Sequence, residues 1–186
     1  IQEQTDYAVG ITKAFRENFS QFGGEARIES FTTDTRDFRT ILAKLKSESP
    51  DALLISASDP PSITTILKQL PELDWKPRLL GADIIAGFDI VKTNPELVEG
   101  MLVAEFGVDR SLPKFNAFLE KYKARYQGEE PGFLSYAQTE YDAVQILKDA
   151  VLAVGEEPDA IRLWLHTVKN WAGASGTVAI TGGTSA

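Results

Sequence analysis

Short apolar stretches alternate with amphipathic segments through the first half of the chain. Three of these stretches, residues 52–59, 77–83 and 100–105, end abruptly in polar groups. They follow one another at intervals of about 25 residues with helical segments between them, which is the spacing of a parallel α/β sheet. The strand after Asp51 is apolar without alternation, as expected when helices cover both faces of a sheet. The pattern predicts a three-layer α/β lobe.

The segments between these strands have the periodicity of helices. From Tyr7 to Phe22 apolar residues recur at steps of three and four, and Gly23-Gly24 then supplies a left-handed C-cap. A short strand is predicted over 27–31, and a second helix carries the apolar stripe from Phe38 to Leu45. A third helix is predicted to begin at Pro60 and to run through Leu70.

The order of these elements begins with a helix where a parallel sheet calls for a strand. Ile1 would be the tail of a strand whose body is missing, which leaves the sheet without an element that the repeat requires. The order therefore predicts that this chain is a fragment of a longer protein.

After Asp109 the pattern becomes helical. Three helices are predicted, over 113–126, 136–154 and 158–171, with no strand between Phe106 and Thr177. Only Thr177 to Ile180 returns to β character. A helical segment thus interrupts the strands of a sheet, and the chain then returns to the sheet.

Polar side chains at the ends of the predicted strands are the candidate site. Ser58, Asp59 and Asp83 follow buried strands, and ligands of parallel α/β sheets bind at the carboxyl ends of the strands. Asp83 has no basic neighbour in sequence, which suits a carboxylate offered to a ligand ammonium. The alternatives are that Asp83 caps the helical turn 84–88 and that Asp59 caps the helix that begins at Pro60. Tyr7, at the start of a helix from the same edge, either faces a ligand or packs in the core.

Charge and composition narrow the class of protein. The formal net charge is -8, from 27 acidic and 19 basic residues, and the basic residues are scattered, which argues against a nucleic-acid partner. No apolar run approaches the roughly 20 residues that span a membrane. The chain has no cysteine, so it has no disulfide, thiolate nucleophile or cysteine-bound metal. The first six residues do not have the pattern of a signal peptide.

Enzyme signatures are absent from the sequence. The single histidine, His166, lies in a predicted helix beside Trp164 and Leu165, where a structural or surface role is expected. There is no nucleophile elbow, no P-loop and no Gly-x-Gly-x-x-Gly phosphate cradle. No catalytic residue, metal site or cofactor is therefore predicted.

The order and spacing of several segments resemble a known family. These segments are 6–10, 31–38 with 42–46, 50–56, 80–83, 99–101 and 136–147. Together they resemble the extracytoplasmic solute-binding proteins of ABC transporters for branched-chain amino acids, which have the type I periplasmic-binding fold. In that fold two α/β lobes enclose a ligand and three crossovers join them.

The resemblance implies an assignment for each part of the chain. Residues 1–108 resemble the second ligand-binding lobe without its first strand, 109–172 the crossover helices that belong to the first lobe, and 173–186 a returning strand. The first lobe, which would be a partner of this piece, has no counterpart here. Tyr7 matches a family tyrosine at the ligand and Asp83 an acidic residue that holds the α-ammonium. Ser58 falls near another ligand-binding tyrosine, and this departure leaves branched-chain specificity open.

The resemblance also implies a function. It is non-catalytic binding of a small solute, an amino acid or related compound, for delivery to the membrane permease of an ABC transporter. The location would be periplasmic or extracytoplasmic, with a lipid anchor possible in the full-length protein. Two alternatives remain: a ligand-sensing module of a receptor or transcriptional regulator with the same fold, and an α/β enzyme of flavodoxin-like architecture.

Overall fold

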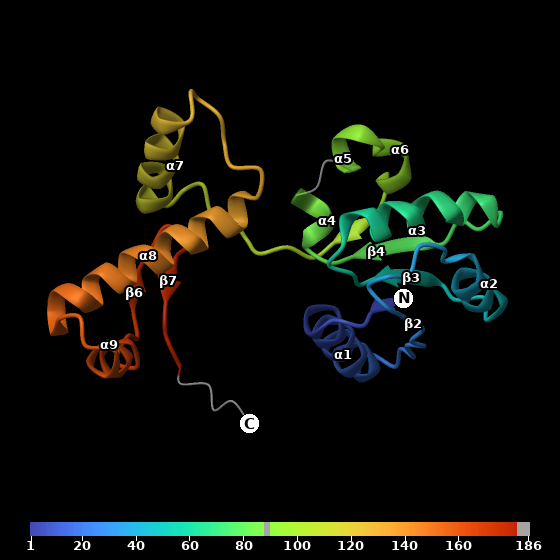
Figure 1. The fold of residues 1–186 in the computed structure, drawn as a ribbon, viewed down its shortest axis with the longest axis horizontal. Coiled ribbons are helices and arrows are strands. Elements are labelled where there is room, and N and C mark those ends of the chain that lie inside the picture. The colour runs from blue at the N-terminus through green and yellow to red at the C-terminus, as the bar shows by residue number, and fades with distance from the viewer. Residues whose placement is uncertain (88–89, 182–186) are drawn as a thin grey trace. The chain divides into compact units, whose positions relative to one another are not determined.

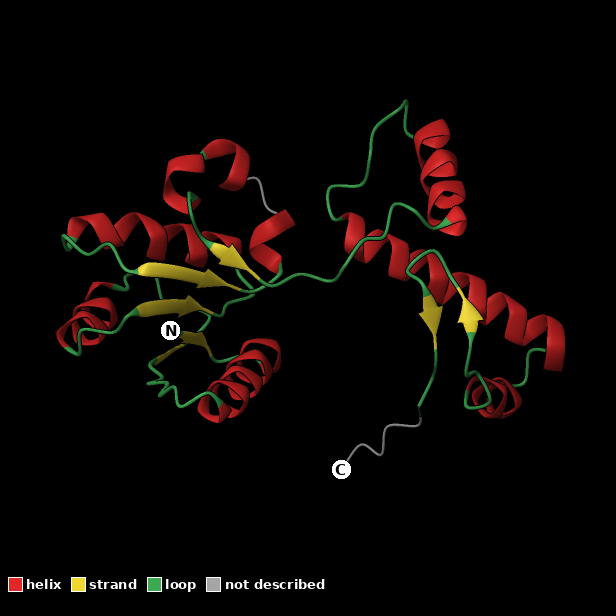
Figure 2. Ribbon diagram, turned by 180° about the vertical axis from the view of Figure 1, so that it is seen from behind, coloured by secondary structure: helices red, strands yellow, loops and turns green. Residues whose placement is uncertain are grey.

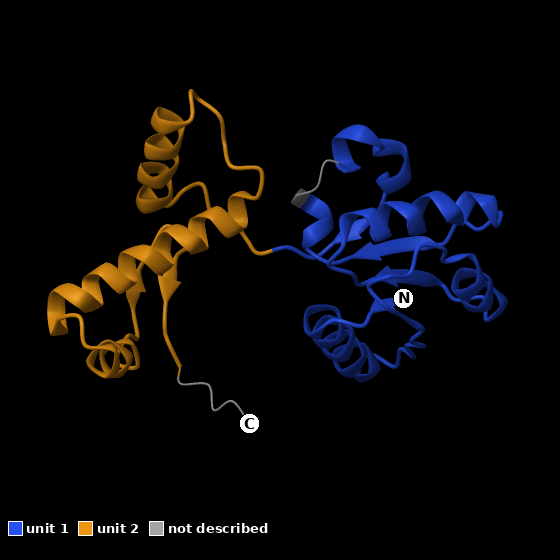
Figure 3. Ribbon diagram, in the orientation of Figure 1, with its two compact units in different colours: residues 1–105 blue, residues 106–186 orange. Residues whose placement is uncertain are grey.

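The computed structural model describes residues 1–87 and 90–181. The chain forms two compact units, unit 1 over Ile1–Glu105 and unit 2 over Phe106–Ala186, shown in different colours in Figure 3. The boundary at residue 108 that the resemblance implies, with its assignment of the two parts to different lobes, stays a prediction.

Unit 1 alternates strands and helices along the chain, as Figure 1 shows. Its elements are β1 (Gln2–Glu3), α1 (Asp6–Gln21), β2 (Ser30–Phe31), α2 (Arg39–Ser47), β3 (Ala52–Ile55), α3 (Pro60–Glu72), β4 (Arg78–Gly81), α4 (Ile84–Gly87), α5 (Ile90–Thr93), α6 (Pro95–Val98) and β5 (Leu102–Val103).

The strands of unit 1 join in one parallel arrangement. β1 pairs with β2, and β3 pairs with β4, which pairs with β5, all in parallel. A parallel bridge between Gln2 and Ser56 links β1 to the end of β3, with Glu3 N donating to Ser56 O at 2.8 Å. The strand order is therefore 2-1-3-4-5. In sheets of this order β2 is added on one side of β1 and the later strands are added on the other side. Ligands bind at the carboxyl ends of β1 and β3, where the strand order reverses.

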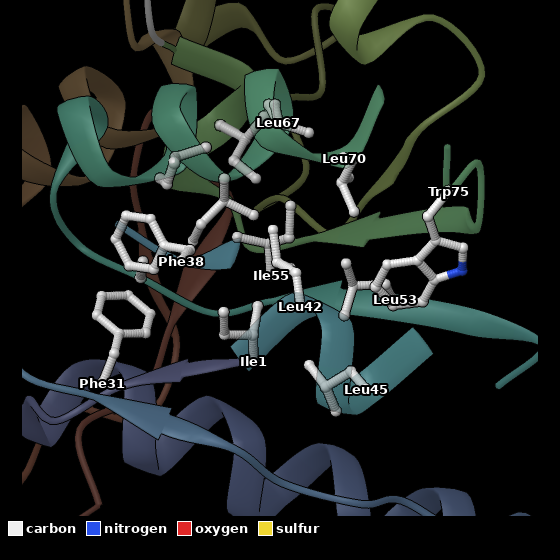
Figure 4. Packing of buried hydrophobic residues seen from close by; sticks show 14 of the residues in the cluster. Ile1, Phe31, Phe38, Leu42, Leu45, Leu53, Ile55, Leu67, Leu70 and Trp75 are labelled. Atoms are coloured by element: carbon white, nitrogen blue, oxygen red, sulfur yellow. The ribbon is translucent and has the colours of Figure 1, made fainter. Parts of the chain in front are cut away.

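Helices cover both faces of this sheet. The main core packs α2 and α3 against the side of β3 that carries Leu53 and Ile55, and Figure 4 shows Phe38, Leu42 and Leu67 in this cluster. The opposite side of the strand carries Ser56, whose hydroxyl donates to the Ala8 carbonyl of α1 at 2.9 Å. α1 therefore lies on the other face, so unit 1 has the three layers that the sequence predicts.

Local signals set the helix ends that the site depends on. Thr5 caps α1 by accepting a hydrogen bond from Ala8 N, and Gly23, with φ of +78°, follows the end of the helix in the left-handed region. Asp59 caps α3, and Pro60 is its first residue.

Unit 2 is a set of helices with a two-stranded ribbon, drawn in Figure 2. Its elements are α7 (Pro113–Arg125), α8 (Leu134–Val154), α9 (Pro158–Leu165), β6 (Trp171–Ala172) and β7 (Thr177–Val178), and β6 and β7 are antiparallel. A small apolar core joins Phe115, Phe118 and Leu119 of α7 to Ala174 in the turn between the two strands. Asp142 of α8 is buried and accepts hydrogen bonds from the Ala174 and Ser175 backbone N–H groups, which fixes this turn on the helix.

Some elements differ from those that the sequence predicts. Unit 1 was expected to lack its first strand, yet Gln2–Glu3 forms a short one that pairs with β2. The strand predicted over 27–31 comprises only Ser30–Phe31, and the one expected from Gly100 to Phe106 only Leu102–Val103. Apolar residues alone therefore overestimate these strands, because a strand residue must also find a partner for its backbone.

In unit 2 the last predicted helix is too long. α9 ends at Leu165, and Trp171 belongs to β6, so the prediction of no strand between Phe106 and Thr177 is wrong. Trp171 pairs with Val178, and its indole N–H donates to Asp149 Oδ2 at 3.0 Å. These long-range contacts outweigh the local helical pattern. The predicted strand Thr177 to Ile180 comprises only Thr177–Val178, and residues 182–186 of the predicted returning segment lie outside the described part.

Candidate functional site

Three candidate residues follow the carboxyl ends of neighbouring strands in unit 1. Tyr7 lies on α1 after β1, Ser58 follows β3, and Asp83 follows β4. Because these strands are parallel, their carboxyl ends meet at one edge of the sheet. We call the residues after β1, β3 and β4 the polar edge. All three candidates are partly buried.

Tyr7 and Asp83 are in direct contact at the polar edge. The Tyr7 hydroxyl donates a hydrogen bond to Asp83 Oδ1. The cap at Thr5 fixes the first turn of α1, so the ring of Tyr7 is held by the start of a regular helix. Desolvation, followed by the hydrogen bond to and the negative charge of Asp83, raises the pKa of Tyr7 above its usual value of 10. The tyrosine is therefore a neutral donor to a carboxylate.

The backbone of Asp83 also begins the next helical turn. Ala86 N donates to the Asp83 carbonyl oxygen at 3.0 Å, ahead of α4. The predicted turn extends to Phe88, which lies outside the described residues.

Ser58 is held by a residue that the sequence pattern did not single out. Glu3, at the end of β1, is 1% exposed, and its Oε2 accepts hydrogen bonds from both the backbone N–H and the hydroxyl of Ser58, each at 2.6 Å. A buried carboxylate requires such donors, because charge without partners is costly away from water. Glu3 is the last residue of β1, whereas Asp83 lies two residues beyond the end of β4. β1 is too short to be visible in the sequence.

Asp59 has the capping role that was one alternative for it. Its Oδ2 accepts from Ser62 N at 3.0 Å and from Ser62 Oγ at 2.7 Å, at the start of α3. We therefore assign Asp59 to the helix end.

Outside the polar edge, the part of the chain that the structure describes carries few groups suited to catalysis or metal binding. His166 is exposed at the C-cap of α9. No three histidine or acidic side chains within residues 1–87 and 90–181 are arranged to hold a metal ion. Among the helices described, none has the length and apolar character to cross a membrane.

A cavity in unit 1 is separate from the polar edge. It measures about 840 Å³ and lies on the face of the sheet next to α1. Apolar residues of α1 and of β3, β4 and β5 line it together with charged residues near the amino ends of the strands, and Tyr7, Ser58 and Asp83 are not among its lining residues.

A parallel sheet of this order, covered by helices and carrying polar residues at its carboxyl edge, places unit 1 in the class of α/β ligand-binding folds. The chain belongs to the periplasmic binding protein family, whose family description matches residues 1–185. Among curated proteins, none matches this sequence.

Solved structures of the same fold confirm the type I periplasmic-binding architecture. A leucine-binding protein from Thermotoga maritima is 30% identical with a TM-score of 0.83, and the match covers 96% of this chain and 51% of that one. A type 1 periplasmic binding protein from Bordetella pertussis is 18% identical with a TM-score of 0.85, covering 97% and 52%. A substrate-binding protein of an ABC transporter from Desulfitobacterium hafniense, solved with Leu, is 21% identical with a TM-score of 0.68, covering 96% and 51%. The chain thus spans about half the length of these proteins, as the prediction of a fragment requires.

Proposed function

We propose that the complete protein to which this chain belongs binds a small solute carrying an ammonium group, an amino acid or a related compound, without transforming it. It would deliver this solute, outside the cytoplasm, to the membrane permease of an ABC transporter. The names of the similar proteins support this class of ligand, and membership of the family supports a binding role.

The observation that carries the proposal is the position of Asp83. Its carboxylate lies at the carboxyl edge of a parallel sheet, next to the strands between which the chain reverses direction, and Tyr7 donates to one of its oxygens. A carboxylate has several lone pairs and can accept hydrogen bonds from more than one donor. A charge-assisted hydrogen bond of this kind contributes about 1.5 to 3 kcal/mol.

The exposed apolar surface of unit 2 supports a second part of the proposal. Val144, Leu147 and Leu152 on α8 and Leu163 on α9 are exposed, Leu152 by 78%. An exposed apolar patch of this kind marks an interaction surface. Because the similar proteins are about twice as long, we propose that this surface packs against the rest of the polypeptide, as part of the first lobe.

Isothermal titration calorimetry of the complete protein with each standard L-amino acid tests the proposed function. At least one amino acid should bind, and Asp83→Asn should weaken its binding by about tenfold or more, which corresponds to one charge-assisted contact. Asparagine retains an oxygen for the Tyr7 hydroxyl but lacks the charge.

The matched control is Asp51→Asn. Asp51 is exposed and precedes β3, so the substitution removes the same charge from the amino edge of the sheet. The Asp51→Asn variant should bind the amino acid as tightly as the unmodified protein does. Failure of every amino acid to bind would refute the proposed ligand class, and equal effects of the two variants would refute the role of Asp83.

A further inference from the structure

Glu3 uses one oxygen atom to accept both hydrogen atoms that Ser58 has to donate. The backbone N–H and the hydroxyl of Ser58 both point at Glu3 Oε2, each with a heavy-atom distance of 2.6 Å. Glu3 is 1% exposed, so water does not compete for this oxygen. Such short bonds to a carboxylate are stronger than bonds between neutral groups.

This arrangement decides which hydrogen-bonding role Ser58 retains. A serine hydroxyl has one hydrogen to donate and two lone pairs that accept. With the hydrogen directed to Glu3, Ser58 Oγ presents only lone pairs to anything that approaches the polar edge. Tyr7 has the same restriction, because its hydroxyl hydrogen is directed to Asp83.

We propose that Glu3 is a positioning residue that makes Ser58 an obligate hydrogen-bond acceptor in the ligand site. The polar edge of unit 1 then consists of three acceptors: the Asp83 carboxylate, Ser58 Oγ and Tyr7 Oη. Such an edge selects a cation with several N–H donors, namely a primary ammonium, over a hydroxyl group with one donor and over a carboxylate with none. This inference rests on the proposed function and deepens it.

A pair of the same kind elsewhere in unit 1 serves as a comparison. Asp59 Oδ2 accepts from both the N–H and the hydroxyl of Ser62, at 3.0 and 2.7 Å. There the carboxylate belongs to a helix cap and both partners are close in sequence. Glu3 and Ser58 are 55 residues apart, and Glu3 is the end of a strand at the point where the sheet order reverses. Helix capping explains the Asp59–Ser62 pair. It does not explain the Glu3–Ser58 pair, which joins two distant segments of the chain.

The first experiment measures the Glu3–Ser58 bond without any ligand. In ¹H–¹⁵N NMR spectra of the 186-residue chain, the Ser58 amide proton should resonate far downfield, because its acceptor is an anion at short distance. Glu3→Gln should move this resonance far upfield and leave the Ser62 amide in place, whereas Asp59→Asn should shift the Ser62 amide and leave the Ser58 amide far downfield. If Glu3→Gln does not change the chemical shift of the Ser58 amide proton, the proposal is wrong, whichever ligand the complete protein binds.

The second experiment measures selectivity in the complete protein. The probes are the amino acid that binds most tightly in the calorimetric panel and its analogue in which a hydroxyl replaces the α-ammonium. Glu3→Gln should weaken binding of the amino acid by about tenfold and binding of the hydroxy analogue by less than threefold, so the preference for ammonium falls. In a Ser58→Ala background Glu3→Gln should have less than a twofold effect, because the residue it positions is gone.

The outcomes separate this inference from the proposed function. If an amino acid binds but Glu3→Gln weakens both probes equally, or acts as strongly when Ser58 is alanine, Glu3 is merely structural and the inference is wrong. If no amino acid binds, the proposed function fails, and the selectivity for ammonium fails with it even when the NMR signature is present. Glu72→Gln, at the exposed end of α3, is the control for loss of one charge and should leave both affinities unchanged.

Discussion

The hydroxyl of Tyr7 on α1 donates a hydrogen bond to the carboxylate of Asp83 after β4, although 76 residues separate them in the chain. The contact joins the elements that follow two strands of one parallel sheet. It orients the carboxylate and keeps the tyrosine neutral. Both residues thereby become parts of one edge whose chemistry can be tested.

Tyr7→Phe should remove a tyrosine ionisation that occurs above pH 10. Desolvation and the nearby Asp83 raise the pKa of Tyr7 above 10, so its contribution to stability is complete below pH 10. Above pH 10 the tyrosine of the unfolded chain ionises while the folded one stays neutral, and this contribution is lost as the pH rises through the folded pKa. Ultraviolet absorbance at alkaline pH measures the ionisation.

The control for this titration is Tyr126→Phe, since Tyr126 is 50% exposed. In that variant the ionisation step that is lost in Tyr7→Phe should remain. If Tyr7→Phe also retains this step, the hydrogen bond to Asp83 does not form in solution.

Asp59→Ala should destabilise unit 1 without altering its fold. The substitution removes the acceptor for Ser62 N–H at the first turn of α3, and loss of such a cap costs about 1 kcal/mol of unfolding free energy. Urea unfolding followed by the fluorescence of Trp75, with Trp164 and Trp171 replaced by Phe, reports on unit 1 alone. Asp51→Ala, an exposed residue before β3, should change the midpoint little; an equal shift in both variants would contradict the cap.

Much of unit 1 could be predicted because local and tertiary signals agree there. β4, Arg78–Gly81, lies within the predicted apolar stretch 77–83. The apolar stripe of α3 follows from the apolar spacing, and its cap at Asp59 follows from Asp-Pro at the helix start. Asp83 and Ser58 were found because a polar residue directly after a buried apolar strand is visible in the sequence. Their role as ligand contacts stays a prediction.

The parts of the fold that were not predicted depend on long-range contacts, which the periodicity of the sequence does not reveal. β1 is two residues long, so neither the strand nor Glu3 at its end gives a periodic signal. Its pairing with β2 and its bridge to Ser56, both distant in the chain, define the strand. Trp171 continues an apolar helical pattern, yet its pairing with Val178 makes it a strand residue. In both cases a partner far away in the chain overrides local preference.

Asp142→Asn should destabilise unit 2 although it changes neither size nor shape. Asp142 accepts three hydrogen bonds, from Ala174 N, Ser175 N and Ser175 Oγ, at 2.6 to 2.7 Å. An asparagine must turn its NH₂ group toward at least one of these donors, which leaves a buried donor unpaired and costs about 2 to 3 kcal/mol. Hydrogen exchange by mass spectrometry should show faster exchange in the turn between β6 and β7.

Asp159→Asn is the matched control for that measurement, because Asp159 is exposed on α9. Exchange in the turn should equal that of the unmodified chain. Unchanged protection of this turn in Asp142→Asn would show that the apolar contacts of Ala174 hold the turn without the carboxylate.

The loop between α7 and α8 should loosen in acid because of Glu130. Its carboxylate bonds to Arg110 Nη2 at 2.9 Å and to Lys123 Nζ at 3.0 Å, and these cations lower the pKa of Glu130 from 4.5 to about 2. Because the folded pKa is depressed, the contribution of Glu130 is complete above pH 4.5 and is lost as the pH falls toward 2. Glu130→Gln should abolish the part of the pH dependence of loop exchange that lies between these values, whereas Glu129→Gln, its neighbour, should retain it. Since the network is exposed, 1 M salt should weaken this pH dependence of loop exchange in the unmodified chain. A pH profile that is identical with and without Glu130 would mean that Arg110 and Lys123 do not hold the loop.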